Sequence, residues 1–405
     1  MGEDIYSLIN QITPADSKAI LAARRKWDSI AKPLGSLGAF EDIIAEMAGL
    51  MGTAEVSVKK PVLAVLCADN GVVEEGVSQS GQEVTLSVMR ALAERKSTVS
   101  FMAEETGCKV IPVDIGVCLE NESNISCEIK DIEELCNWTD KDLLLYEGGF
   151  SHITRNDNYR KTENKDSNDN KRLRILDRRI RNGTGNIAKE PAMTMEECIK
   201  AVQNGISIVR DLKNKGFDLI LTGEMGIGNT TTSAAVASVL TGKDPSFFVG
   251  RGAGLPDEKL KRKLEIVKRA IAFHNPDPED IIGVLSAVGG FDIAGLCGMF
   301  LGGAIEKVPV VIDGYISSVA ALCAYRLNPL SKKAMIASHL TAEQGGQLII
   351  EELGKKAVIQ ADMHLGEGGG AIMLFPMLKM ALAVYNSGHV FDQLGIEAYQ
   401  RFEHA

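Results

Sequence analysis

Five short apolar runs along the chain each end in a polar segment that contains glycine or histidine. A run of this length, in a chain whose other apolar positions have helical spacing, is typical of a strand buried on both faces of a parallel sheet. Ligands of such sheets bind beyond the carboxyl ends of the strands, so we expect five loops to converge on one cleft of an enzyme. The runs are 61–67 before Ala68-Asp69-Asn70-Gly71, 110–113 before Asp114-Ile115-Gly116, 219–222 before Gly223-Glu224-Met225-Gly226, 308–312 before Asp313-Gly314-Tyr315, and 334–337 before Ser338-His339.

Between these runs, apolar residues recur every three or four positions, which is the pattern of amphipathic helices. The alternation of strands and helices predicts an α/β fold with a doubly wound, mostly parallel sheet and helices on both faces. Helices are expected over 14–31, with Asp16 or Ser17 as the N-terminal cap, and over 39–51, 84–106, 195–215, 371–387 and 390–402.

The same pattern suggests how the chain divides into domains. Residues 1–60 together with about 371–405 are expected to form a small helical domain, and residues 61–370 a large α/β catalytic domain. Residues 118–174 interrupt the alternation, and their second half is polar without an apolar face. We expect this insertion to be partly disordered or a surface loop.

Composition narrows the class of protein. A hydrophobic content of 45% with 24% charged residues is ordinary for a globular chain. The net charge of −10 argues against a nucleic-acid partner, but it does not exclude an anionic small molecule. The apolar stretch 281–305 carries Asp292 and several glycines, which favours a buried loop and helix over a membrane span.

The 8 cysteines show neither a CxxC pair nor the spacing of His/Cys metal ligands, so we expect no metal site. Cys67, Cys108, Cys297 and Cys323 lie in apolar segments and are expected in the core. The first residues lack the pattern of a secretory signal, and we expect a cytoplasmic protein.

The glycine-rich segment 223–230 falls short of two known nucleotide motifs. Asn229 stands where the P-loop requires a lysine, and Thr231 stands at the third glycine of the dinucleotide fingerprint. What remains is a strand, a glycine turn and a helix start that carries Thr230, Thr232 and Ser233. Free amides and hydroxyls of this kind suit a single phosphate. A plain tight turn is the alternative.

A second glycine segment, 250–255, precedes a helix with a basic start. One lysine of this helix could reach an anion held by the first glycine turn, whereas the other basic side chains are expected on the surface. The basic residues are Lys259, Lys261, Arg262 and Lys263.

Glu367 lies among glycines, in Leu365-Gly366-Glu367-Gly368-Gly369-Gly370, just before a predicted helix. The glycines would let a substrate approach the backbone, which favours a general base. A carboxylate that caps the helix is an equally good interpretation of the same flanks. Asp69, Glu224 and Asp313 also end strands, and each taken alone is better explained as a residue that holds a loop.

Eight longer motifs follow one another over almost the whole chain. They are KPLGSLG from Lys32, ADNGVVEEGVS from Ala68, GNIAKEPAMT from Gly185, GEMGIGNTTTSAA from Gly223, GGFDIAGLCG from Gly289, DGYISSVAAL from Asp313, SHLTAEQGG from Ser338 and LGEGGGA from Leu365. In sequence and in order, these motifs resemble nicotinate-nucleotide:5,6-dimethylbenzimidazole phosphoribosyltransferases, which act in assembly of the lower ligand of cobalamin.

The resemblance implies transfer of phosphoribose from nicotinate mononucleotide to 5,6-dimethylbenzimidazole or a related base, which gives α-ribazole 5′-phosphate and nicotinate. It implies a homodimer with sites near the interface. No cofactor is expected.

The resemblance also assigns residues. Glu367 would remove the azole proton, Glu224 would lie near the reacting ribose, and Ser80 would line the base pocket. Val88 stands where some similar enzymes place a glutamine beside the base. The other implied substrate contacts are Met225, Gly226, Ile227, Gly228, Asn229 and Thr230 with Lys263 and Gly252 for the 5′-phosphate, Asp313 and Gly314 for the ribose, and Leu365, Gly366 and Gly368 beside the base.

The implied chemistry needs few groups. Nicotinate bound through its ring nitrogen is a cationic pyridinium, which departs without a proton, so one carboxylate that accepts the azole proton suffices. Two other classes stay open from the residues alone. One is a hydride-transfer enzyme on a dinucleotide fold, weakened by the failed fingerprint, and the other is a non-enzymatic cobamide or nucleotide carrier, weakened by the converging loops.

Overall fold

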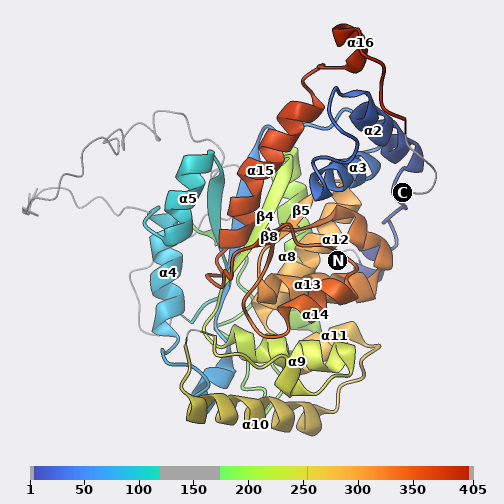
Figure 1. Ribbon diagram of the computed structural model, residues 1–405. Coiled ribbons are helices and arrows are strands. Elements are labelled where there is room, and N and C mark those ends of the chain that lie inside the picture. The colour runs from blue at the N-terminus through green and yellow to red at the C-terminus, as the bar shows by residue number, and fades with distance from the viewer. Residues whose placement is uncertain (1–3, 119–173, 253, 401–405) are drawn as a thin grey trace, which may run out of the picture.

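The computed structural model describes residues 4–118, 174–252 and 254–400 (Figure 1). The predictions for the polar insertion 118–174 therefore concern a segment that lies, apart from its two end residues, outside the described residues.

A six-stranded sheet forms the centre of the molecule, and every neighbouring pair of its strands is parallel (Figure 1). All five predicted strands are confirmed, and β3 is an additional short strand. The order is β3-β2-β1-β4-β5-β6, a doubly wound order that reverses between β1 and β4. The strands are β1 Pro61–Ala68, β2 Lys109–Gly116, β3 Leu176–Asp177, β4 Leu219–Met225, β5 Val310–Ile312 and β6 Met335–Ala337; β7 His339–Leu340 and β8 Ile359–Gln360 pair separately.

The register brings the ends of β1 and β4 level with each other. Leu66 lies opposite Glu224, and Cys67 lies opposite Met225. The loops that follow both strands therefore leave the sheet side by side, at the point where the strand order reverses. Open α/β sheets bind their ligands in the crevice at this point.

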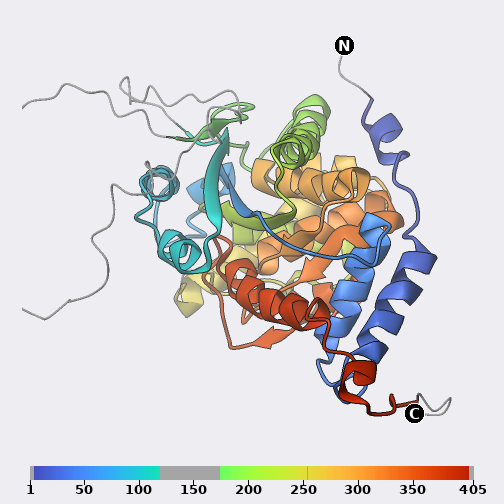
Figure 2. The ribbon, with the colours of Figure 1, turned by 90° about the horizontal axis from the view of Figure 1, so that it is seen from above.

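Helices cover both faces of the sheet, as predicted (Figure 2). They are α1 Ile5–Ile9, α2 Ser17–Ser29, α3 Ala39–Met51, α4 Glu83–Ala93, α5 Thr98–Thr106, α8 Met195–Asn214, α9 Asn229–Thr241, α10 Asp257–His274, α11 Ile281–Val288, α12 Phe291–Glu306, α13 Tyr315–Leu327, α14 Gly346–Glu352, α15 Gly369–Tyr385 and α16 Phe391–Leu394, with 3-10 turns at Gly71–Glu75, Pro245–Phe247 and Pro329–Ala334.

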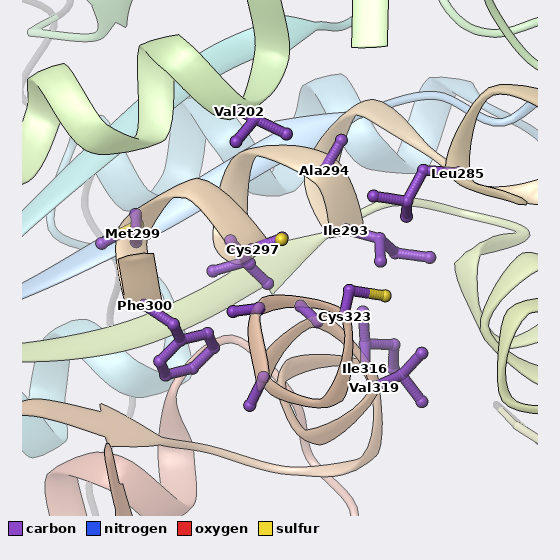
Figure 3. Close-up of a cluster of buried hydrophobic side chains, with 14 of the residues drawn as sticks. Val202, Leu285, Ile293, Ala294, Cys297, Met299, Phe300, Ile316, Val319 and Cys323 are labelled. Carbon is purple, nitrogen blue, oxygen red and sulfur yellow. The ribbon is translucent and has the colours of Figure 1, made fainter. Parts of the chain in front are cut away.

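Alternate residues of β1 belong to two different cores. Val62, Ala64 and Leu66 pack into the core that includes α8, α12 and α13, part of which Figure 3 shows around Cys297 and Cys323. Leu63, Val65 and Cys67 pack into the core shared with α2, α3, α4, α5 and α15. The four cysteines predicted as core residues are all buried.

Most predicted helices are confirmed with small shifts of their ends. Asp16 caps α2, because its carboxylate accepts hydrogen bonds from the amides of Lys18 and Ala19. Helix α3 covers the predicted range, and α8 ends one residue earlier than predicted. The stretch 281–305 contains two helices, α11 and α12, broken at Gly289 and Gly290. None of the described helices is long and apolar enough to cross a membrane.

Two helix predictions are wrong. The range 84–106 is not one helix, because Arg95 adopts a left-handed φ of 57° and Ser97 caps a new helix, α5. Of the described residues 390–400, only the four of α16 are helical, and this helix ends at Gly395, whose φ of 63° is left-handed. Residues 395–400 are exposed and carry no helix, so the apolar spacing there lacks the packing surface that stabilises a short helix.

Candidate active site

Glu367 lies on a strained turn that joins β8 to α15. Gly366, Glu367 and Gly368 have φ values of 75°, 57° and 94°, so three consecutive residues are left-handed and one of them is not glycine. Such backbone conformations cost free energy and concentrate at functional sites. The turn passes directly over β4, where a Cβ on Gly223 would lie 2.5 Å from the carbonyl oxygen of Glu367.

Asp313 holds this turn in place. Its two carboxylate oxygens accept hydrogen bonds from the amides of Gly368, Gly370 and Ala371 at 3.1, 2.7 and 3.0 Å. The pKa of Asp313 is raised to about 6, because the effect of burial exceeds the opposing effect of these hydrogen bonds. The structure thus places Asp313 against the N-terminus of α15, a position that favours a negative charge.

The Glu367 carboxylate carries an oxygen without a partner. Its Oε2 is buried and makes no hydrogen bond to any described residue. Burial raises the pKa of Glu367 above its ordinary value. A carboxylate that is shielded from water and free of donors is a stronger proton acceptor than an exposed one. The glutamate does not cap α15, since its neighbours' amides bind Asp313.

Glu224 approaches the same turn from the end of β4. Its Oε1 lies 2.9 Å from the position that a Cβ on Gly366 would take, and its Oε2 accepts a hydrogen bond from Asn229 Nδ2. Burial raises the pKa of Glu224 to about 8, and the nearby charges of Asp292, Asp313 and Glu367 add to the effect. The structure therefore brings the two predicted catalytic glutamates together.

The glycine turn after β4 starts a helix whose first turn is rich in hydroxyls. Gly228, with a φ of 95°, is the N-cap of α9 and provides no side chain to satisfy the helix amides. The hydroxyls of Thr231 and Ser233 are buried without a partner among the described residues.

The glycine turn itself is closely packed. At Gly226, a Cβ would lie 2.4 Å from the carbonyl oxygen of Ala68. Ile227 is held by a hydrogen bond from its amide to Thr85 Oγ1 at 3.1 Å.

Lys263 lies beside this helix start. Only 1% of its surface is exposed, and its Nζ donates to Thr230 Oγ1 at 2.7 Å and to the carbonyl oxygen of Gly250 at 3.2 Å. Burial lowers the pKa of Lys263 to about 8, against the raising influence of Glu343. Gly252 completes the group, since a Cβ there would lie 3.2 Å from Thr230 Oγ1 and 3.7 Å from Lys263 Nζ. A buried ammonium, a glycine loop and a helix N-terminus are features that suit the binding of an anion.

The other basic residues at the start of α10 are exposed, as predicted. They are Lys259, Lys261 and Arg262. Ser80 is half-buried, and its amide donates a hydrogen bond of 3.3 Å to Ser78 Oγ within its own loop. Leu365 is 45% exposed at the edge of the Glu367 turn.

Two residues near the site were not assigned a role from the sequence. His339 is 5% exposed, and a Cβ on Gly370 or Gly314 would lie 1.8 Å or 3.6 Å from its ring. Asp292, noted only as a charge in an apolar stretch, is completely buried and accepts a hydrogen bond from Asn229 Nδ2 at 3.0 Å. Two sequence features could have pointed to them: His339 directly follows a predicted strand, and Asp292 closely follows a glycine pair.

The site thus combines buried carboxylates at one end with a buried lysine at the other. Within the described part of the chain, no three His, Cys, Asp or Glu side chains are placed to share a metal ion. The arrangement can hold an anion at the start of α9, stabilise a cation near Glu224 and accept a proton at Glu367.

Comparison with known proteins agrees with this chemistry. The model of a phosphoribosyltransferase family, DBI_PRT, matches residues 12–396, so the chain belongs to this family of phosphoribosyltransferases. Its relatives include nicotinate-nucleotide–dimethylbenzimidazole phosphoribosyltransferases. The one from Acetivibrio thermocellus is 42% identical over 93% of this chain and 93% of its own. The one from Clostridium acetobutylicum is 40% identical over 98% of this chain and 99% of its own.

A solved structure has the same fold. CobT from Thermus thermophilus superimposes with a TM-score of 0.78 at 29% identity, covering 94% of this chain and 99% of that one. Membership in a phosphoribosyltransferase family argues against both alternatives left open by the residues. These are the dinucleotide-dependent hydride-transfer enzyme and the non-enzymatic carrier.

Proposed function

We propose that this protein transfers phosphoribose from nicotinate mononucleotide to 5,6-dimethylbenzimidazole or a related base, and that it acts in the synthesis of the cobalamin nucleotide loop. The products are α-ribazole 5′-phosphate and nicotinate. The observation that carries the proposal is the unpartnered, buried oxygen of Glu367 next to Glu224. Relatives that share about two fifths of its residues carry the name of this activity.

The two ends of the site bind different parts of the substrate. The 5′-phosphate binds at the turn from Met225 to Thr230, where the buried ammonium of Lys263 and the backbone at Gly252 meet it. The ribose lies over Glu224, with Asp313 and Gly314 behind the turn. The incoming base stacks at the open edge near Leu365, Gly366, Gly368 and Ser80, with one ring nitrogen directed at Glu367.

The reaction then needs a single proton transfer. The bond between C1′ and the pyridinium nitrogen breaks, and its electron pair leaves with nicotinate and neutralises the ring cation. One azole nitrogen bonds to C1′ from the opposite face, which inverts the anomer to the α form. The other azole nitrogen gives its proton to Glu367, a step that contributes about 10² to 10⁴ in rate. Glu224 stabilises the positive charge that develops on the ribose.

Turnover with the two substrates tests this proposal. The protein is mixed with nicotinate mononucleotide and 5,6-dimethylbenzimidazole, and nicotinate and α-ribazole 5′-phosphate are measured by chromatography. Equal amounts of the two products are expected, and none when the base is omitted. Nucleotide binding without either product would contradict the proposal. A panel of benzimidazoles, purines and phenols in competition identifies the preferred base, for which the partly buried Val88 on α4 is a candidate determinant.

We further propose a homodimer in which residues 1–60 and about 371–405, a small helical domain, take part in the contact. Helix α15 supports this because Met373, Met380 and Val384 are 48%, 63% and 37% exposed, and their spacing puts them on one face of the helix. A second copy of the chain would bury that face. Light scattering should give twice the mass of 43.6 kDa. Met380→Glu should yield a monomer while Lys379→Glu, next to it, should not.

The place of action that we propose is the cytoplasm. Six cysteines of the described residues are free, which suits a reducing compartment. The anion site is built from a single buried lysine and backbone amides, a pattern for a small phosphate ester and not for a nucleic acid, whose binding requires a basic face.

A further inference from the structure

The side-chain amide of Asn229 joins two carboxylates that come from different elements. Its Nδ2 donates to Oε2 of Glu224, at the end of β4, and, at 3.0 Å, to Oδ2 of Asp292 in the first turn of α12. All three residues are buried. An amide nitrogen carries two hydrogens, so both are committed to carboxylates and the orientation of the Asn229 side chain is determined.

This orientation decides what the site presents to a substrate. The amide oxygen of Asn229 accepts no hydrogen bond from the described residues. It is therefore left as an acceptor beside the glycine turn and suits a hydroxyl of the ribose. Were the amide reversed, its oxygen would face two carboxylates and its hydrogens would face the substrate.

Asp292 is itself fixed on its other side. Its Oδ1 accepts a hydrogen bond from the amide of Ile293 at 3.0 Å, and a Cβ on Gly290 would lie 2.5 Å from the same oxygen. Its Oδ2 lies 3.0 Å from the position of a Cβ on Gly226, so Asp292 also packs against the glycine turn. Contacts on both oxygens therefore hold the carboxylate in one position.

The charges around Glu224 come from three further elements. Asp292 on α12, Asp313 after β5 and Glu367 before α15 each raise its pKa. Burial raises the pKa of the Cys67 thiol on β1, and the charges of Asp114, Glu224, Glu367 and Asp292 add to the effect. Asp292 is the first of the charged neighbours in its effect on Glu224. Removal of the Asp292 charge should therefore make Glu224 ionise at lower pH.

We propose that Asp292 is a positioning residue for the transfer reaction, which acts through Asn229 to hold Glu224 under the ribose and to turn the Asn229 amide oxygen toward a ribose hydroxyl. The inference rests on the proposed location of the ribose at Glu224. Asp292 does not contact the reacting atoms. It sets the geometry and the ionisation of the group that does.

The test compares Asp292→Asn, Asp292→Glu and Glu224→Gln, with turnover of nicotinate mononucleotide and dimethylbenzimidazole measured from pH 5 to pH 10. Asp292→Asn keeps the size of the side chain but can serve only one of the two donors, Asn229 or Ile293. We expect kcat/KM for the nucleotide to fall about 10²-fold, since small displacements of a reacting group have effects of this size. The acid limb of the profile should move to lower pH.

The other variants separate charge, position and folding. Asp292→Glu keeps the charge and displaces the oxygen, so the rate should fall while the limb stays in place. In a Glu224→Gln background, Asp292→Asn should have little further effect, because the two residues act in series. Asp114→Asn is the matched control, since Asp114 is a buried carboxylate at the end of β2 that accepts from the Gly116 and Val117 amides. It should lower stability without moving the limb.

Three outcomes would overturn the inference. One is an unchanged rate and limb in Asp292→Asn when Glu224→Gln is impaired. The second is an equal loss from Asp292→Asn in the presence and absence of Glu224. The third is full activity of Glu224→Gln, which would remove the ribose from Glu224 and so contradict the proposed site as well. If Asp292→Asn does not fold, the Asp292→Glu profile decides between the first outcome and the expected one.

Discussion

The two ends of the candidate site lie at the end of strand β4 and at the turn that follows it, yet they have opposite electrostatics. At the end proposed to bind the phosphate, one buried ammonium, Lys263, has its pKa lowered to about 8. At the end proposed to bind the ribose, the buried carboxylates of Glu224, Asp292 and Asp313 have their pKa values raised to about 8, 6 and 6. In both places burial is the largest cause, because it disfavours whichever charge the group carries.

This difference fits the proposed substrate, which carries an anionic phosphate at one end and a cationic pyridinium at the other. A phosphate would provide the anionic partner for Lys263, and a pyridinium or an oxocarbenium carbon would provide a cationic one for the carboxylates. In the proposed reaction, the free energy that burial of these groups costs would be recovered on binding and in the transition state.

The largest effect is expected from Glu367→Gln. The amide keeps the shape of the side chain but cannot accept the azole proton, so kcat should fall about 10²- to 10⁴-fold. Affinity for nicotinate mononucleotide, measured by calorimetry, should stay within a factor of a few because the phosphate end is intact. The exposed Glu397→Gln serves as control. An unaltered kcat in Glu367→Gln would remove this residue from the role of base.

Gly223→Ala tests whether the backbone position of the Glu367 turn controls the rate. The new methyl group would lie 2.5 Å from the carbonyl oxygen of Glu367 and must displace the strained turn. We expect kcat to fall about 10²-fold, as for other small displacements of reacting groups. Gly314→Ala, whose Cβ would lie 3.6 Å from His339, should cost much less. If both variants behave alike, close packing of the turn does not govern the rate.

Lys263→Met removes the buried positive charge at the proposed phosphate site and leaves the carboxylates unchanged. Loss of a charge-assisted hydrogen bond should raise KM for the nucleotide about 10- to 100-fold, with a smaller change in kcat. Lys261→Met, on the exposed side of the same helix, is the matched control and should leave KM unchanged. A fall in kcat at constant KM would place Lys263 at the reacting centre and not at the phosphate.

The smallest effect concerns stability of the free protein as a function of pH. Glu224, Asp292 and Asp313 hold protons in the folded state that the unfolded chain has released. Their contribution to stability is therefore complete only below about pH 4 and is lost as pH rises through about 6 and then 8. Lys263 has the opposite sign, since its folded form releases its proton first. Its penalty applies below about pH 8 and disappears as pH rises from there to the ordinary pKa of lysine.

Urea unfolding at pH 5, 8 and 10 measures this profile. Stability should fall from pH 5 to 8 and recover in part above it, and Glu224→Gln should flatten the first part without altering the second. A stability that stays constant between pH 5 and 8, in the wild type as in Glu224→Gln, would mean that the buried carboxylates are ionised throughout.

Much of this molecule was determined by local sequence. The five apolar runs became strands, because a run of β-branched and aliphatic residues bounded by glycine has few other ways to bury itself. Glycines at positions such as 228 and 366 adopt the left-handed conformations that glycine adopts at little cost, so the turns could be located. The family motifs identified the segments that form the site.

The tertiary structure determined where two of the predicted helices end and which distant residues bind the buried polar groups. Residues 84–106 and 390–402 have helical spacing, but the first range is broken at Arg95 and, in the second, residues 395–400 are exposed and form no helix. Asp313 binds amides 55 to 58 residues further along the chain, and Asn229 joins Glu224 to Asp292, which is 63 residues away from it. Periodicity records only neighbours within a turn or two, whereas a buried polar group is satisfied by whichever donor the fold brings to it.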